Sequence, residues 1–366
     1  MEPQVNAEKT QEAEIPLFKV IPKLRGQVPH ASLTNVPTPL FKMEKLGEFL
    51  GHDALYIKDD GATSTVYGGN KARKLEFILA EAAAKGAKRV ITNGAASSNH
   101  ALATAAHAKR LGLACTAILF PQPKTTTCRN NLLCHSALGT ELIMCPLEEY
   151  EKKTEEVAKK WEKEEGVAPY IVPTGGTSVL GTLGYVNAAL ELGEQIKAGV
   201  MPSPDVIYVV AGTFGTVIGV TLGMKLLKEK ARVKPIRISY PDLFPQESYD
   251  KLLEDVASLI KEKGDVTFDL PDAEERKIID DFYGEGYAIE TAEHREILET
   301  VLRLENIELE TTYTVRAMAA LMDDVKKGNL KGKVALFWRT NNTSDLSPLI
   351  EKGDREKLPK EFQEYV

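Results

Sequence analysis

The sequence predicts an α/β protein of two lobes, each built on an open, twisted and mostly parallel sheet. From residue 55 onward, short β-branched segments alternate with longer segments whose apolar residues recur at helical spacing. Strands that alternate with helices in this way form parallel sheets. The alternation starts afresh after a helical stretch at 182–199, and the length of 366 residues suits two domains.

The first α/β run extends from residue 55 to residue 173. Strands are predicted at 55–60, 89–94, 114–120, 141–145 and 169–173. Helices are predicted at 74–87, 99–113 and 128–138, and Gly86 and Gly112 mark the ends of the first two. The highly charged stretch 147–166 carries Glu and Lys four residues apart, which predicts a solvated outer helix.

The second run begins after the helix at 182–199. Strands are predicted at 205–210, 234–240 and 333–338, and helices at 217–227, 293–307 and 314–328. Residues 206–227 carry a single charge and are long enough to suggest a membrane span. Their β-branched start, the turn AGTFGT and the apolar continuation instead favour a strand, a loop and a helix.

These runs define the predicted domains. Residues 1–77 and 191–366 are expected to form a large domain, and residues 78–190 a small α/β domain. The polar start and the proline-containing stretch up to about residue 32 are expected to drape over the large domain. A site between the two lobes is the expectation for this layout.

Composition narrows the class of function. The net charge is −7 and the hydrophobic content 43%, which disfavours nucleic acid or an anionic membrane as a partner and favours small-molecule chemistry. Residues 1–14 lack the apolar segment of a signal peptide, so a cytoplasmic location is expected. The four cysteines (115, 128, 134 and 145) form no C-x-x-C pair, so buried free thiols are expected and no metal site.

Four glycine- or serine-rich turns lie at predicted strand-to-helix junctions. They are GGNKARKLE (68–76), NGAASSNH (93–100), PTGGTSVLGTLGY (173–185) and AGTFGT (211–216). Ligands of open α/β sheets bind at such turns, and helix N-termini suit phosphate groups. AGTFGT is neither a Walker A loop nor G-x-G-x-x-G. Lys71 directly follows a flexible turn, which is a position suited to a lysine that binds a carbonyl cofactor covalently.

These turns, together with GEGYAIET and LETTYTVRAM, resemble one family from about residue 33 to residue 346. It is the pyridoxal-phosphate-dependent D-cysteine desulfhydrase and 1-aminocyclopropane-1-carboxylate deaminase family, of the tryptophan-synthase-β fold type. The pair formed by GGNK-x-RKLE and the later SNH is specific to it. The resemblance implies that pyridoxal 5'-phosphate is bound in the cleft between the lobes, and that the protein is a homodimer.

The resemblance also assigns roles around the reacting atoms. Lys71 would hold the cofactor, and Arg73 and Lys74 would be structural or surface residues. Ser98 would lie near the substrate as base or nucleophile. Asn99 would lie near the phenolic oxygen of the cofactor and contribute to substrate binding, and His100 would orient this pair.

Further residues are implied on the large domain. Two tyrosines, Tyr287 and Tyr313, match catalytic tyrosines near the substrate and the cofactor ring. Gly212, Thr213, Gly215 and Thr216 would cradle the phosphate. Phe214 departs from the glycine-rich family loop, although its backbone donors can remain. Thr340 matches a threonine near the pyridine nitrogen, where a neutral hydroxyl favours elimination.

The activity implied is α,β-elimination from D-cysteine, which gives pyruvate, sulfide and ammonia. Thr314 replaces a glutamate typical of the deaminases, which favours the desulfhydrase. Arg339-Thr340-Asn341-Asn342 replaces a His-Thr-Gly-Gly stretch, and Ser97 stands where glycine or glutamine is commoner. The substrate and its stereochemistry therefore stay open. The alternatives are opening of 1-aminocyclopropane-1-carboxylate to 2-oxobutanoate and ammonia, a β-replacement synthase, and a non-catalytic protein that binds the cofactor.

Overall fold

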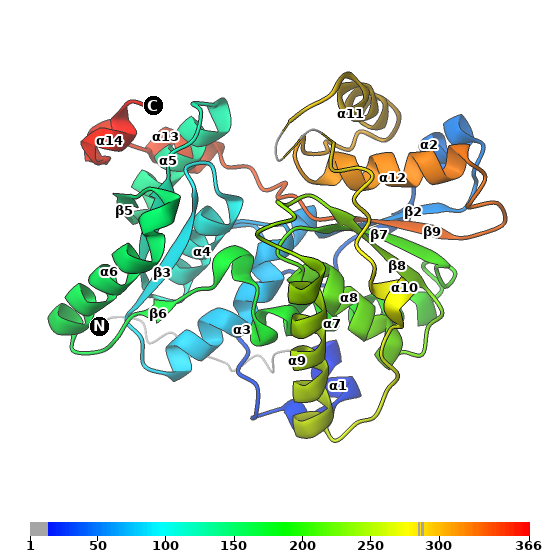
Figure 1. The fold of residues 1–366 in the computed structure, drawn as a ribbon, viewed down its shortest axis with the longest axis horizontal. Helices are drawn as coiled ribbons and strands as arrows, with labels where there is room; N and C mark the ends of the chain where they lie inside the picture. The colour runs from blue at the N-terminus through cyan, green and yellow to red at the C-terminus, as the bar shows by residue number, and fades with distance from the viewer. Residues whose placement is uncertain (1–13, 285, 287–288) are drawn as a thin grey trace, which may run out of the picture.

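A computed structural model describes residues 14–284, 286 and 289–366, and these residues fold around two sheets. The larger sheet has five strands in the order β1-β2-β9-β7-β8, and the smaller has four in the order β5-β4-β3-β6. Every pair of strands is parallel except β1 with β2. The predicted α/β fold with two mostly parallel sheets is confirmed (Figure 1).

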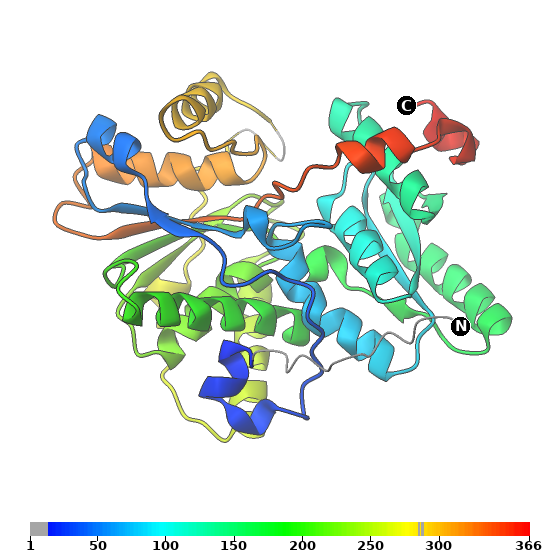
Figure 2. The same cartoon turned by 180° about the vertical axis from the view of Figure 1, so that it is seen from behind.

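The larger sheet is covered by helices on both faces. Its strands are β1 (Leu40–Lys42), β2 (Leu55–Asp59), β7 (Val206–Ala211), β8 (Arg232–Arg237) and β9 (Ala335–Arg339). One face carries α1 (Pro16–Val20), α7 (Val179–Lys197), α8 (Gly215–Leu226) and α9 (Gln246–Gly264). The other carries α2 (Glu44–Leu50), α11 (Ala292–Glu305) and α12 (Thr314–Lys326), as Figure 2 shows from behind. The central strands β7 and β9 are therefore buried along their whole length.

The smaller sheet consists of β3 (Arg89–Ala95), β4 (Ala114–Phe120), β5 (Glu141–Met144) and β6 (Tyr170–Ile171). Helices α4 (Asn99–Arg110) and α5 (Thr126–Leu138) pack with its core, and the charged α6 (Tyr150–Glu165) buries little more than Thr154 and Val157. The chain then returns from β9 to this lobe. There α13 (Ser347–Lys352) lies beside α5, and α14 (Lys360–Gln363) buries Phe362.

Helix α3 (Asn70–Ala84) joins the two lobes. Leu75, Ile78 and Leu79 pack in the core beneath the smaller sheet, and Phe77 packs with α1 and α7 of the larger lobe. Apolar residues therefore surround this helix on several sides, and ten of its fifteen residues are buried. Its first turn, which carries Lys71, is consequently held by both lobes.

Some elements differ from the prediction. Helix α3 begins at Asn70, four residues before the predicted start at 74, and α9, α2 and β1 were not predicted. Helix α7 packs against α8 and the larger sheet. The domain boundaries at 78 and 190 remain a prediction. All four cysteines are buried free thiols. Among the helices of the described residues, none has the length and apolarity needed to cross a membrane.

Candidate active site

Lys71 lies in the first turn of α3, behind a glycine turn that other residues could not form. Gly69 has φ +79°, and a Cβ on Gly68 would approach the Gly61 carbonyl oxygen to 2.0 Å. Burial lowers the pKa of Lys71 to about 8 from 10.5. No described residue forms a hydrogen bond or ion pair with its amine. The amine is therefore available to react with a bound carbonyl compound.

A cluster of hydroxyl groups and an amine surrounds the N-terminus of α8. A Cβ on Gly215 would lie 3.1 Å from each of Lys74 Nζ, Thr177 Oγ1 and Thr182 Oγ1, so these three polar atoms converge on this glycine. The hydroxyls of Thr177 and Thr213 are 2.6 Å apart. No side chain caps the first turn of α8, and the Gly215 N–H donates to the Thr213 carbonyl, which leaves the N–H groups of Thr216 and Val217 for a ligand.

Lys74 lies one helical turn after Lys71 and is fully buried. Its amine donates to the Gly175 carbonyl at 3.2 Å and to the Thr177 hydroxyl at 3.1 Å. Burial and the neighbouring Lys71 hold the pKa of Lys74 well below its usual range. A buried amine of this kind is stabilised by an anion at the same place. Lys74 was predicted to be structural or at the surface, and its burial excludes the surface position.

The first turn of α4 supplies a third set of polar groups. Ser98 caps this helix, and its Oγ accepts from the Ala101 N–H at 3.1 Å. His100 is buried, and neither ring nitrogen has a hydrogen-bond partner. Burial, followed by Lys71 and Lys74, holds the pKa of His100 well below its usual range, so its imidazole is neutral. The Asn99 carboxamide accepts from the Tyr67 hydroxyl at 3.0 Å.

The end of β9 completes the surroundings of Lys71. The Thr340 carbonyl accepts from the Asn70 N–H at 2.9 Å, which places Thr340 directly beneath the lysine turn. Asn70 also donates through Nδ2 to the Thr216 hydroxyl at 3.0 Å, so it joins this turn to α8. In the loop before α8, the Gly212 carbonyl accepts from the Ser239 hydroxyl at 2.9 Å.

Phe214 takes a backbone conformation in the loop before α8 that glycine would ordinarily provide. Its backbone has φ +69°, a left-handed conformation that usually favours glycine. The side chain is 3% exposed and packs edge-on against Phe244 and Tyr249. Aromatic packing thus offsets the backbone strain, and the ring lies in the core of the larger lobe.

The two predicted tyrosines are only partly placed. Tyr313 is the residue before α12 and is half-buried, and Tyr287 lies outside the described residues. Arg316, one turn into α12, is fully buried and donates to the carbonyls of Tyr283, Gly286 (2.7 Å) and Ile289 (3.3 Å). Helix α12 therefore anchors the described residues on both sides of Tyr287.

Comparison with known proteins identifies the family. A family model described as pyridoxal-phosphate dependent enzyme matches residues 31–339. The chain belongs to this family. A solved structure described as an ACC deaminase homologue is 30% identical, with 93% of this chain and 100% of that chain covered and a TM-score of 0.75.

Two further solved structures share the fold. A pyridoxal 5'-phosphate-dependent aspartate racemase is 16% identical, covers 90% of this chain and 95% of its own, and has a TM-score of 0.60. Threonine deaminase isoform 2 from Solanum lycopersicum is 17% identical, covers 92% of both chains, and has a TM-score of 0.59. The protein is accordingly a pyridoxal-phosphate-dependent enzyme with the fold of these proteins.

The residues present fit the cofactor of this family. The buried Thr182 hydroxyl and both nitrogens of His100 lack partners in the described protein, and the Lys74 amine faces the uncapped N-terminus of α8. A phosphate there would accept from the Thr182 hydroxyl and the Lys74 amine, as anions do at helix N-termini. Lys71 would then hold the aldehyde carbon of the same molecule.

Three residues of this cradle were not predicted as cofactor ligands: Lys74, Thr177 and Thr182. Lys74 lies in the recognised turn at a spacing of three from Lys71, which places both on one face of α3. This spacing could have indicated from the sequence that the two amines lie close together. The two threonines come from the PTGG turn and the start of α7, and only the folded chain brings them to Gly215.

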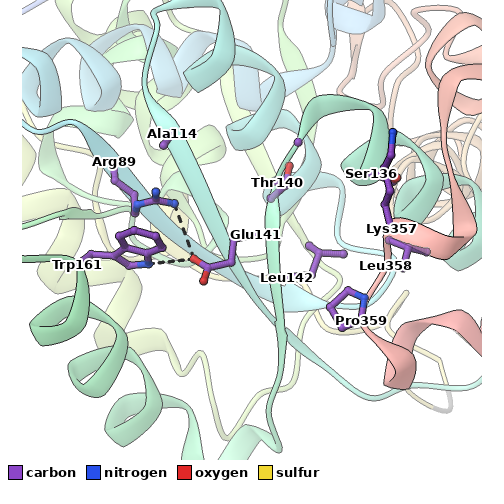
Figure 3. A pocket seen from close by; sticks show the side chains of 11 residues that line it. Arg89, Ala114, Ser136, Thr140, Glu141, Leu142, Trp161, Lys357, Leu358 and Pro359 are labelled. Carbon is purple, nitrogen blue, oxygen red and sulfur yellow. Dashed lines mark hydrogen bonds and ion pairs between the residues drawn. The ribbon is translucent and has the colours of Figure 1, made fainter. Parts of the chain in front are cut away.

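A cavity of about 460 Å³ lies at the opposite edge of the smaller sheet (Figure 3). Arg89 and Glu141, the first residues of β3 and β5, line it. The Arg89 guanidinium stacks on the Trp161 ring, and the Trp161 Nε1 donates to Glu141 at 2.9 Å. These charged groups already pair with each other, and ligands of parallel sheets bind at the carboxyl ends of strands. We therefore place the candidate active site at Lys71 and not in this cavity.

Proposed function

We propose that the protein catalyses pyridoxal-phosphate-dependent α,β-elimination from a small amino acid, with D-cysteine as the substrate. One D-cysteine and one water give pyruvate, hydrogen sulfide and ammonia. The Cα–H and Cβ–S bonds break, sulfur leaves with the Cβ–S bonding pair, and water replaces nitrogen at the α-carbon. The bound cofactor supplies the electron-withdrawing ring that stabilises charge at the α-carbon.

The single observation that carries this proposal is the Lys71 amine. Its pKa is lowered to about 8, and no described residue competes for it. A neutral amine can hold the cofactor, and once the substrate has replaced it there, it can remove the α-proton. The Ser98 hydroxyl uses a lone pair to cap α4. We therefore assign proton removal to Lys71 and substrate contact to Ser98.

Thr340 supports elimination over chemistry that needs a charged pyridine ring. Thr340 is 5% exposed and follows β9, and no described residue forms a hydrogen bond with its hydroxyl. A hydroxyl at the ring nitrogen leaves that nitrogen neutral, because only an acidic partner would hold a proton there. The cofactor ring then withdraws electron density less strongly. This weaker withdrawal is enough for a reaction in which a good leaving group departs from the β-carbon.

Opening of 1-aminocyclopropane-1-carboxylate is the second candidate, because the 30%-identical structure is described as an ACC deaminase homologue. Thr314 argues against it. This residue replaces the glutamate expected in the deaminases, it is fully buried, and its hydroxyl accepts from the Glu310 N–H at 2.7 Å. Thr314 therefore cannot provide the acidic group that a glutamate would offer to a substrate.

The test is the absorption spectrum of the purified protein with each candidate substrate, beside Lys71→Ala. We expect a visible cofactor band that the variant lacks, and release of sulfide and pyruvate from D-cysteine. Production of 2-oxobutanoate from 1-aminocyclopropane-1-carboxylate without sulfide from D-cysteine would replace the first proposal with the second. Consumption of added sulfide would identify a β-replacement synthase. A band that no amino acid changes would favour a binding protein.

The homodimer and the cytoplasmic location remain parts of this proposal. The homodimer follows from the family resemblance. Sedimentation of the purified protein at two concentrations tests the dimer, and a sedimenting monomer would remove it. Fractionation of cells that express the full chain tests the location.

A further inference from the structure

Tyr67 is held at both ends by α4, the helix that carries Asn99. Its carbonyl lies 2.9 Å from His107 Nε2, and its hydroxyl donates to Asn99 Oδ1 at 3.0 Å. Asn99 and His107 are eight residues apart, which places them on one face of α4 about two turns apart. Tyr67 is 2% exposed and directly precedes the glycines of the Lys71 turn.

The chemistry of both contacts determines which atom donates. The Tyr67 carbonyl can only accept, so the His107 Nε2 carries the proton. Burial lowers the pKa of His107, which keeps that ring neutral. Burial, followed by Cys134 and Glu310, raises the pKa of Tyr67, so its hydroxyl stays protonated and available as a donor.

A donor at Oδ1 fixes the orientation of the Asn99 carboxamide. Only Oδ1 can accept the proton of the tyrosine, so Nδ2 must point to the opposite side. No described residue accepts from Nδ2. This NH₂ group is therefore available to donate to the phenolic oxygen of the cofactor, the contact expected for Asn99. With the opposite orientation, the carboxamide oxygen would face a ring oxygen and repel it.

We propose that Tyr67 is a positioning residue, which acts through Asn99 on the phenolic oxygen of the bound cofactor and ties the Lys71 turn to α4. This inference rests on the placement of the cofactor at Lys71, but not on the identity of the substrate. A hydrogen bond to that oxygen stabilises its negative charge, which eases loss of the proton that it shares with the lysine nitrogen. The bound cofactor should therefore titrate at lower pH with Tyr67 than without it.

The experiment compares Tyr67→Phe with the native protein in the absence of substrate. The readouts are the pH at which the visible cofactor band titrates and the dissociation constant of the cofactor. We expect the titration midpoint to rise and the dissociation constant to increase about fivefold, the effect of one hydrogen bond. Tyr208→Phe is the matched control, because that buried hydroxyl donates to Asp324 on the far side of β7.

A double-mutant cycle separates positioning from a general effect on the fold. In an Asn99→Ala background, Tyr67→Phe should change the titration midpoint no further, because the carboxamide that it orients is gone. An equal shift in both backgrounds would overturn the proposal. So would an unchanged midpoint in Tyr67→Phe, or the same shift in Tyr208→Phe. Loss of the band in Lys71→Ala establishes that the band reports on this site, so failure of D-cysteine as a substrate leaves the test intact.

Discussion

The side-chain amide of Asn70 donates to the hydroxyl of Thr216 at 3.0 Å. This bond joins the residue before Lys71, the lysine proposed to hold the cofactor, to the first turn of α8, so it links the two ends of the proposed cofactor site. We predict that Asn70→Ala weakens cofactor binding about tenfold, because the lysine and the phosphate cradle are no longer held together. Titration of the apoprotein with pyridoxal phosphate measures this loss. If Thr216→Val in the Asn70→Ala background lowers the affinity as much again, the two residues act separately.

Lys74 should have opposite effects on stability and on binding. Lys74→Met removes a buried amine, so the apoprotein should gain about 1–2 kcal/mol in its free energy of unfolding. The same change should weaken the binding of pyridoxal phosphate by about 10–100-fold, because the phosphate loses a charged donor. Denaturant unfolding and cofactor titration provide the two measurements. Pyridoxal without its phosphate is the control ligand, and an equal loss of affinity for it would contradict a phosphate role.

The reactivity of Lys71 should follow its lowered pKa. The neutral amine attacks an aldehyde, and a pKa of about 8 in place of 10.5 makes this form abundant at lower pH. The rate at which the apoprotein captures pyridoxal phosphate should therefore rise with pH and level off above about pH 8. Stopped-flow absorbance across neutral to alkaline pH measures this rate. Lys71→Ala should lack the whole phase, and a rate that keeps rising to pH 10.5 would show that the amine is not desolvated.

Phe214 and Lys228 form a matched pair, since both have a left-handed backbone, with φ +69° and +58°. Phe214→Gly relieves strain but empties an aromatic cluster, so it should destabilise the protein by about 2–3 kcal/mol. Lys228→Gly at the exposed end of α8 relieves the same strain without a packing loss, and should stabilise by up to about 1 kcal/mol. Thermal unfolding of the two variants measures both signs. A stabilising Phe214→Gly would refute the claim that packing holds this loop.

Arg73 should be essential to the fold. It is fully buried, and it pairs with Asp60 at 2.8 Å and with Glu191 at 2.9 Å. Arg73→Met leaves Asp60 without its cationic partner and leaves Glu191 with Lys58 alone, so it should cost about 3–5 kcal/mol in the free energy of unfolding. The exposed Arg295, 3.2 Å from Glu290, is the matched control, and Arg295→Met should cost less than about 1 kcal/mol. Similar costs for the two variants, measured by denaturant unfolding, would contradict this account.

Much of the fold could be predicted because its signals are local. Strands β3, β4 and β7 are short β-branched runs, and the turns around Lys71 and Ser98 carry glycine and serine at their predicted positions. Helix α9 also had a usable signal in Leu253, Val256 and Ile260, which recur at helical spacing and are buried. By contrast, β1 has three residues and a single buried one, which leaves no periodic pattern to detect.

The missing parts of the site depend on contacts between distant segments. Thr182 is separated from Gly215 by more than thirty residues, and nothing in either segment indicates that they meet. Likewise, the contact of Tyr67 with Asn99 joins residues 32 apart. Single residues of common types acquire a role only when the turns of two lobes converge, so the family resemblance could place the recognised motifs but not these partners.

The return of the chain from β9 to the smaller lobe has a consequence for synthesis. Leu358 and Phe362 pack with Ala101, Leu119 and Leu132 in the core of that lobe, although all four strands of its sheet are encoded before residue 172. A ribosome must therefore reach residue 362 before this core can close. Until then, the helix that presents Ser98 and Asn99 rests on an incomplete core, so the emerging chain has to wait for its C-terminal helices before it can hold the cofactor firmly.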